Sequence, residues 1–167
     1  TGTTEVTSVN PEALTKSAAK QSIDEALKAK TDEIDARTDL TDEEKTAAKG
    51  DAKTKADAAK TAIDNATTND AVTQVKNDGA ASVASVTPAA VAKMEAKQAI
   101  DEALKAKSAE IDARTDLTDE EKTVAKLDAK AKADAAKATI DNAITNAEVE
   151  QAKVTGITEV KAVDPQP

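Results

Sequence analysis

The sequence predicts an all-α protein: two tandem antiparallel helical-bundle repeats, each with two long helices and one short helix. Short extended Gly-to-Pro linkers are expected to join the repeats in an elongated arrangement. Two observations lead to this fold. The chain of 167 residues repeats at a shift of 77 positions, as Gly2, Gly79 and Gly156 illustrate (79 − 2 and 156 − 79). Between these glycines, Ala, Lys, Glu and Asp dominate with a helical period.

A ten-residue joint marks the repeat boundaries and occurs three times. It reads GTTEVTSVNP (2–11), GAASVASVTP (79–88) and GITEVKAVDP (156–165). We expect each Gly to end a helix in a left-handed conformation, and each closing Pro to begin the next helix after an Asn, Thr or Asp N-cap. The third copy would open a further repeat, so we interpret the chain as a piece of a tandem array.

These joints divide the chain into five predicted segments: an N-terminal joint (1–10), repeat 1 (11–78), an inter-repeat joint (79–87), repeat 2 (88–155) and a C-terminal joint (156–167).

The first helix of each repeat is predicted from an apolar stripe at three-to-four-residue steps. In the first repeat it runs from Pro11 to about Arg37, and its predicted core residues are Leu14, Ala19, Ile23, Leu27 and Ile34. The second repeat offers Val91, Ala96, Ile100, Leu104 and Ile111 at the same places.

The second helix of each repeat is predicted to begin at a capping box. Thr41 as N-cap with Glu44 three residues later fits this motif, as do Thr118 and Glu121. An alanine stripe follows, at 48, 52, 56 and 59 and again at 125, 129, 133 and 136. A third, shorter helix is expected after Thr68 or Asn69, and after Thr145 or Asn146.

Pairs of valines recur within the joints, three residues apart. They are Val6 and Val9, Val83 and Val86, and Val160 and Val163. In an extended three-fold conformation each pair would share one face and could lie against a neighbouring bundle. Sequence alone leaves a docked joint and a loose one both open, and we favour the docked form. The structural residues predicted at the joints are Gly79, Val83, Val86, Pro88, Gly156, Val160, Val163 and Pro165.

Composition excludes several functions. The chain has no Phe, Trp, Tyr, Cys or His and a formal net charge of −9. The acidic balance disfavours nucleic acid, and the lack of a long apolar run disfavours membrane insertion. Without His or Cys, and without a phosphate loop or nucleophile elbow, we expect no catalytic site and no cofactor.

The densest acidic segment, residues 35–44, has two interpretations. Asp35, Asp39, Asp42 and Glu43 could form a Ca²⁺ loop, but the EF-hand spacing is absent. Helix capping accounts for each carboxylate without a metal, and this is the interpretation we favour.

Arg37 and Arg114 are the two arginines of the chain. They could be anchors for a binding partner. We favour a structural role, in which each bonds the last carbonyls of its helix and pairs with aspartates across the following turn.

Two long runs carry a resemblance to a known family: AKQSIDEALKAKTDEIDARTDLTDEEKTAAK (19–49) and AKQAIDEALKAKSAEIDARTDLTDEEKTVAK (96–126). Together with the tails AIDNATTNDAV (62–72) and TIDNAITNAEV (139–149), they resemble the helical repeat of unknown function found in tandem arrays in Gram-positive cell-wall-anchored adhesins. The resemblance implies an extracellular, wall-attached, non-enzymatic stalk or spacer that projects an adhesive domain.

An alternative is a helical binding module for a host protein, or for cell–cell self-association in biofilm. Residues 63–66 loosely resemble albumin-binding three-helix modules, so a matrix protein or albumin is the host ligand considered. Neighbouring repeats are the partners expected in either case, and we expect a monomer.

Overall fold

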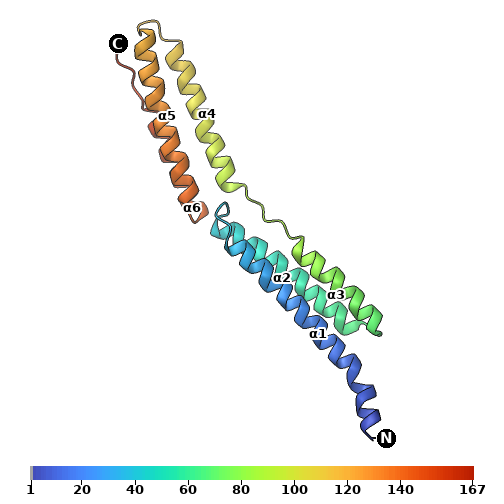
Figure 1. The fold of residues 1–167 in the computed structure, drawn as a ribbon. Coiled ribbons are helices and arrows are strands. Elements are labelled where there is room, and N and C mark those ends of the chain that lie inside the picture. Colours follow the sequence, from blue (N-terminus) through green and yellow to red (C-terminus); the bar gives the residue numbers. More distant parts are fainter. Residues whose placement is uncertain (1) are drawn as a thin grey trace. The chain divides into compact units, whose positions relative to one another are not determined.

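The computed structural model describes the backbone of residues 2–167 and the side chains of residues 13–167. Within this range the chain consists of helices, turns and loops, so the predicted all-α class is confirmed, with two tandem helical bundles (Figure 1). The chain divides into two compact units. Residues 1–37 with 45–88 form the first, and residues 38–44 with 89–167 form the second.

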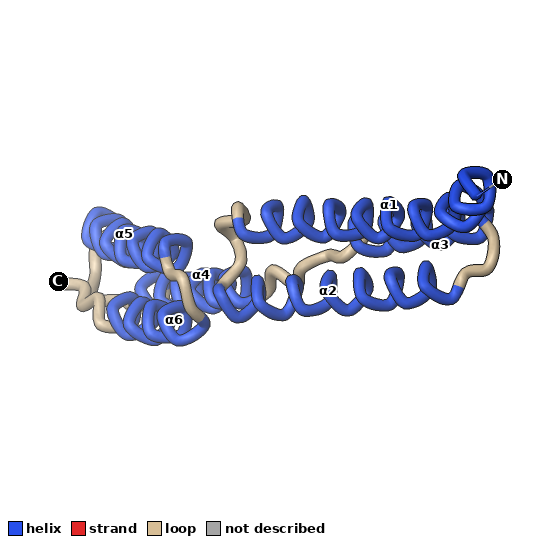
Figure 2. Tube along the Cα trace, turned by 90° about the horizontal axis from the view of Figure 1, so that it is seen from below, coloured by secondary structure: helices blue, strands red, loops and turns tan. Residues whose placement is uncertain are grey.

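The first unit contains α1 (Gly2–Asp35), α2 (Asp42–Asn65) and α3 (Asn69–Ala84). The second contains α4 (Ala92–Asp112), α5 (Asp119–Asn142) and α6 (Asn146–Lys161), together with the segment 38–44, which includes the first turn of α2. In each unit the three helices lie side by side, as Figures 1 and 2 both show.

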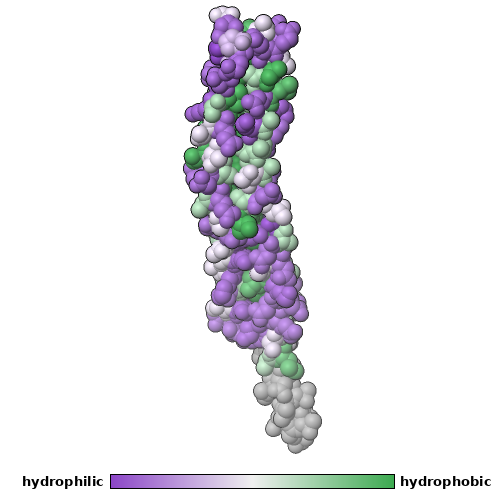
Figure 3. All heavy atoms as spheres, turned by 90° about the vertical axis from the view of Figure 1, so that its left-hand side faces the viewer, coloured by the Kyte–Doolittle hydropathy of each residue, from purple (hydrophilic) through white to green (hydrophobic). Residues whose placement is uncertain are grey.

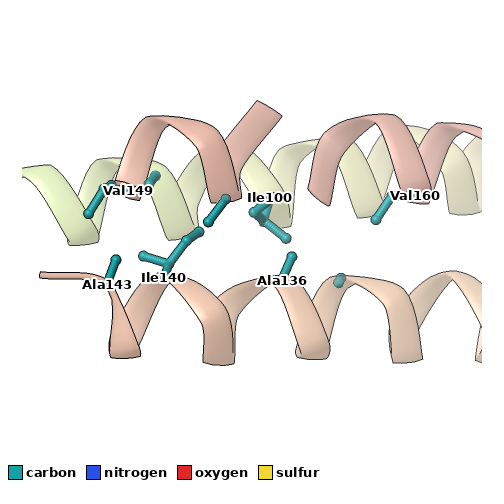
Figure 4. Packing of buried hydrophobic residues seen from close by; sticks show 9 residues of the cluster. Ile100, Ala136, Ile140, Ala143, Val149 and Val160 are labelled. Atoms are coloured by element: carbon teal, nitrogen blue, oxygen red, sulfur yellow. The ribbon is translucent and has the colours of Figure 1, made fainter. Parts of the chain in front are cut away.

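The predicted alanine stripe is the buried face of the second helix in each unit. Buried residues of α2 are Ala48, Ala52, Ala56, Ala59 and Ile63, and those of α5 are Ala125, Ala129, Ala133, Ala136 and Ile140. Small side chains let the helices approach closely, while isoleucines and valines of the neighbouring helices supply the bulk. Figure 4 shows this packing in the second unit, where Ala136 and Ile140 of α5 face the core residues of α4 and α6, namely Ile100, Val149 and Val160.

The first-helix stripe is confirmed except at its N-terminal end. Ala19, Ile23 and Ile34 are buried, as are Ala96, Ile100 and Ile111, whereas Leu27 and Leu104 are half-buried. The prediction is wrong for Leu14 and Val91, whose exposed fractions are 67% and 42%. Helical spacing puts these residues on the apolar face, but they precede the stretch that the other two helices cover.

The joint is helical where an extended strap was predicted. Helix α3 continues through Gly79 to Ala84, and α6 continues through Gly156 to Lys161. Neither glycine has a positive φ, so the predicted left-handed C-caps are wrong. Instead each glycine marks a close helix contact. A Cβ added at Gly79 would overlap the Cβ of Ala59, and one at Gly156 would overlap that of Ala136.

The valines of the joint also pack differently from the prediction. Val83 and Val160 are helical and fully buried, and Val160 belongs to the core of its own unit. They therefore lie in helices and not in the extended strap that was predicted. Val86 and Val163 follow the helix ends and are buried too, at 4% and 6% exposure. The side chains of Val6 and Val9 lie outside the described residues.

The prediction that helices start at the prolines is wrong as well. Helix α4 begins at Ala92, after Pro88, and its N-cap Val91 makes no side-chain cap hydrogen bond. Helix α1 begins at Gly2 rather than Pro11; the predicted Asn10 cap falls among side chains outside the described ones. After Asp164-Pro165 the chain is not helical. The reason for the α4 start is a carboxylate from another segment, described next.

Candidate functional site

Several hydrogen bonds of the second unit converge on the turn of residues 38–44, here called the capping turn. Its sequence, TDLTDEE, folds locally as the predicted capping box. Thr41 Oγ1 accepts from the Glu44 amide at 3.2 Å, and Glu44 Oε1 accepts from the Thr41 amide at 3.0 Å. This reciprocal pair fixes the Glu44 side chain across the start of α2, with its second oxygen facing outward from the box.

That second oxygen caps helix α4. Glu44 Oε2 accepts from the backbone amides of Val91 and Ala92, both at 2.9 Å. The first amides of a helix lack intrahelical partners, and a carboxylate also complements the positive end of the helix dipole. Because these two amides find their acceptor here, α4 can begin at Ala92 without a capping side chain of its own.

The Glu44 carboxylate is accordingly stabilised in its charged form. Its partial burial alone would raise its pKa, but hydrogen bonds from the amides of Thr41, Ala92 and Val91 outweigh this and lower the pKa.

Three further bonds fasten the capping turn to the loop between α5 and α6 and to α4. The Asp42 amide donates to the Ile144 carbonyl at 2.8 Å. Glu43 Oε1 accepts from the Asn146 amide at 2.9 Å, at the start of α6. Lys93 Nζ donates to the Thr38 carbonyl at 2.9 Å and to the Asp141 carbonyl at 2.8 Å. Each partner is a polar group at a helix end or loop, so the bonding satisfies groups that helix geometry leaves open.

The same seven residues recur at 115–121, and their capping box is also formed. Thr118 Oγ1 accepts from the Glu121 amide at 3.1 Å, and Glu121 Oε1 accepts from the Thr118 amide at 2.8 Å. Burial differs between the two copies, since Thr41 is 0% exposed while Thr118 is exposed. Identical sequence thus leads to different surroundings, and the difference comes from what packs on the turn.

A groove of about 350 Å³ lies beside this second turn. Its lining combines the start of α5 with the segment after α6: Glu120, Glu121, Val124, Ala125, Asp128, Val163, Asp164, Pro165 and Gln166. Two residues singled out from the sequence, Val163 and Pro165, therefore lie against the second turn. Their counterparts Val86 and Pro88 are buried and half-buried.

Arg114 pairs across its turn as predicted, whereas the predicted contact with the last carbonyls is wrong. Its Nε and Nη2 donate to the two carboxylate oxygens of Asp116 at 2.7 and 2.6 Å. This hydrogen-bonded pair raises the pKa of Arg114 and lowers that of Asp116. The carbonyl of Asp112 is instead bound by Lys122 Nζ at 3.0 Å. Arg37 is half-buried at the matching position.

Two buried lysines are functional parts of the fold that sequence reasoning missed. Lys30 and Lys107 are each 7% exposed, and their Nζ atoms donate to the carbonyls of Ala84 and Lys161, both at 2.9 Å. They cap the C-terminal ends of α3 and α6 from the first helix of each unit. The available signal was a lysine at the same position of both repeats on the apolar side of the helix.

The acidic segment considered as a Ca²⁺ loop is occupied by other bonds. Asp35 Oδ1 accepts from Lys49 Nζ at 2.8 Å, and Glu43 accepts from Asn146. Over the part of the chain that the structure describes, no group of three or more acidic side chains is placed to hold a metal ion. The same part has no helix long and apolar enough to cross a bilayer.

Comparison with known protein families finds one that matches this chain. The model of the "Domain of Unknown Function (DUF1542)" matches twice, over residues 15–91 and 92–167. This chain belongs to the DUF1542 family. The boundary between its two DUF1542 matches falls between Val91 and Ala92, where the Glu44 carboxylate caps α4.

Relatives of this DUF1542 chain include two very long staphylococcal proteins. It is 36% identical over 138 residues to the extracellular matrix-binding protein EbhA of Staphylococcus aureus strain Newman, and equally to the extracellular matrix-binding protein ebh of strain NCTC 8325 / PS 47. The alignment covers 83% of this chain but only 4% and 1% of those proteins. No solved structure matches the chain.

Proposed function

We propose that the chain is a non-enzymatic spacer repeat of a bacterial surface adhesin. In this role it holds an adhesive region away from the cell wall, and the number of repeats sets the distance. The relatives' name, extracellular matrix-binding protein, supports a setting at the cell surface. For a DUF1542 array to span a distance, the chain must leave each repeat at the end opposite to the one at which it enters.

The observation that carries the proposal is that the chain enters and leaves each unit at opposite ends. In the second unit, the bond from Lys93 to the Asp141 carbonyl puts the start of α4 beside the end of α5. The bond from Lys107 to the Lys161 carbonyl puts the end of α6 beside the later part of α4. The first unit repeats both contacts through Lys16 with Asp64 and Lys30 with Ala84.

An odd number of antiparallel helices produces this result, because each helix reverses the chain direction. Helix α5 has 24 residues, and at about 1.5 Å per residue it is about 36 Å long. Each unit therefore displaces the chain by about one helix length instead of returning it to its starting side. Surface character fits the same role. On the face drawn in Figure 3, hydrophilic residues predominate and hydrophobic ones form small groups.

Small-angle X-ray scattering tests the proposal. A compact domain of 167 residues has a radius of gyration of about 15 Å by the usual size scaling. We expect a clearly larger value, and we expect the maximum dimension to grow by about 36 Å when one further repeat is appended. A radius of gyration near that of the compact domain, with little growth on extension, would refute the spacer function.

A second candidate function is binding to a host extracellular protein, which the relatives' name favours. The surface available for it is a groove of about 580 Å³ along α5 and α6, lined mainly by small residues such as Ala135, Thr139 and Thr155. The test is binding of the 167-residue chain to immobilised matrix protein and to serum albumin. Saturable binding at micromolar concentration that Thr139→Arg abolishes would establish this function, and a null result would leave the spacer.

A further inference from the structure

We infer that the turn of residues 115–121 and the groove beside it form a docking surface for the start of a further copy of this repeat, following in the same chain. The inference deepens the proposed function and rests on it only in taking the repeats as members of a tandem array.

The identical turn at residues 38–44 already makes these contacts once. In the capping turn, Glu44 Oε2 binds the first amides of α4, the Asp42 amide binds the Ile144 carbonyl, and the Thr38 carbonyl binds Lys93. The corresponding groups at Glu121, Asp119 and Thr115 have the same chemistry. Since the capping box fixes Glu121 as it fixes Glu44, Glu121 presents the same second oxygen.

The path by which the chain reaches the turn is repeated as well. In the joint, Val86 is buried and the chain then reaches Val91 and Ala92, which meet Glu44. After α6, Val163 is buried in the same way, and Val163, Asp164 and Pro165 line the groove next to Glu121. Residues continuing beyond Pro165 at the same spacing would therefore arrive at the Glu121 carboxylate.

The opposite end of the repeat carries a matching partner group. Lys16 Nζ donates to the Asp64 carbonyl at 2.9 Å, as Lys93 does to the Asp141 carbonyl. Leu14 is exposed at the place where Val91 lies in the next repeat. Lys93, which binds both the Asp141 carbonyl and the Thr38 carbonyl of the capping turn, thus has a counterpart in Lys16 of the first repeat, so a repeat of this kind is a fitting occupant.

The experiment appends residues 14–88 directly after Pro167. This keeps the repeat spacing (91 − 14 = 77), so that the added Leu and Thr stand where Val91 and Ala92 stand one repeat earlier. NMR-detected hydrogen exchange then follows the Asp119 amide in the original and the extended chain. The Asp42 amide, which is bonded to Ile144, is the internal reference in both.

We expect exchange at Asp119 to slow at least about tenfold on extension, which corresponds to about 1.4 kcal/mol of added protection. Exchange at Asp42 should not change. The variant Glu121→Gln should return Asp119 toward its original rate in the extended chain, while Glu102→Gln, at an exposed residue that does not line the groove, serves as the matched control.

Equal exchange at Asp119 in the two chains would overturn the inference. A concentration-dependent result would overturn it too. If exchange at Asp119 slows in the unextended chain as its concentration rises, and extension slows it no further, the occupant is a separate molecule. Neither result bears on scattering dimensions, so failure of this docking and failure of the spacer function can be told apart.

Discussion

Gly79→Ala should destabilise the first unit, although alanine is the better helix former. A Cβ at this position would overlap the Cβ of Ala59 on α2 and would lie 3.1 Å from Ile23 Cδ1. Both neighbours are buried and both lie on facing helices, Ala59 on α2 and Ile23 on α1, so the helices must separate to admit the methyl group. Gly156→Ala is the same change in the second unit, where the Ile100 Cδ1 distance is 2.8 Å.

The magnitude follows from two opposing effects. Replacing a helical glycine by alanine gains up to about 1 kcal/mol in helix propensity. Inserting a methyl group into a packed core costs about 1–3 kcal/mol, and the upper part of that range applies where a Cβ meets a Cβ on a facing helix. The net loss is about 1–2 kcal/mol, which lowers the melting temperature of a unit of this size by roughly 5–15 °C.

Gly50→Ala is the matched control, because Gly50 is also helical and a Cβ there meets nothing within 4 Å. This variant should gain about 0.5–1 kcal/mol. Thermal unfolding followed by far-ultraviolet circular dichroism measures both changes, since the chain has no aromatic residue for fluorescence.

A double mutant separates the close contact from other effects. Ala59→Gly removes the methyl group that Gly79→Ala would meet, so the double mutant should be more stable than the sum of the two single changes predicts. If Gly79→Ala raises the melting temperature as Gly50→Ala does, the close helix contact does not exist in solution and the reasoning is refuted.

Three other predictions follow from hydrogen bonds at helix ends. Glu44→Gln should lower the free energy of unfolding, measured with urea, by about 1–2 kcal/mol. Glu121→Gln in the same chain should lower it by less than about 1 kcal/mol, because only Glu44 also caps α4. Equal losses would contradict the cap. The pKa values of Glu44 and Asp116 are lowered in the folded state, so their contribution to stability is complete above about pH 4.5 and is lost as the pH falls through the folded-state values. A pH series of urea midpoints should show that loss, and the E44Q chain should show less of it. Lys107→Met should cost about 1 kcal/mol through the lost bond to the Lys161 carbonyl, whereas the exposed Lys105→Met should be neutral; no difference between them would remove the capping role.

The sequence by itself determined the helical class, the repeat and the helix starts that a threonine N-cap marks. Thr41, Thr118 and Thr145 begin their helices as expected, because an N-cap bonds amides two or three residues away and needs no distant partner. The alanine stripes were also readable, since helical period alone puts them on one face.

Tertiary structure decided the ends of the helices at the joint. Glycine is compatible with a helix end and with a close helix contact, and only the position of Ala59 selects the second for Gly79. Proline at 88 permits a helix start, but α4 begins at Ala92 because the acceptor for its first amides is Glu44, 47 positions earlier in the chain.

These features could not be predicted because the capping group and the group that it caps are far apart in the sequence. Lys30 reaches the Ala84 carbonyl across 54 positions, and Lys93 reaches the Thr38 carbonyl across 55. Capping groups supplied by a neighbouring helix leave no local pattern around the amide or carbonyl that they satisfy. Caps contributed from within a segment could therefore be predicted from the residues beside them, while caps contributed from another segment became visible only once the helices were packed.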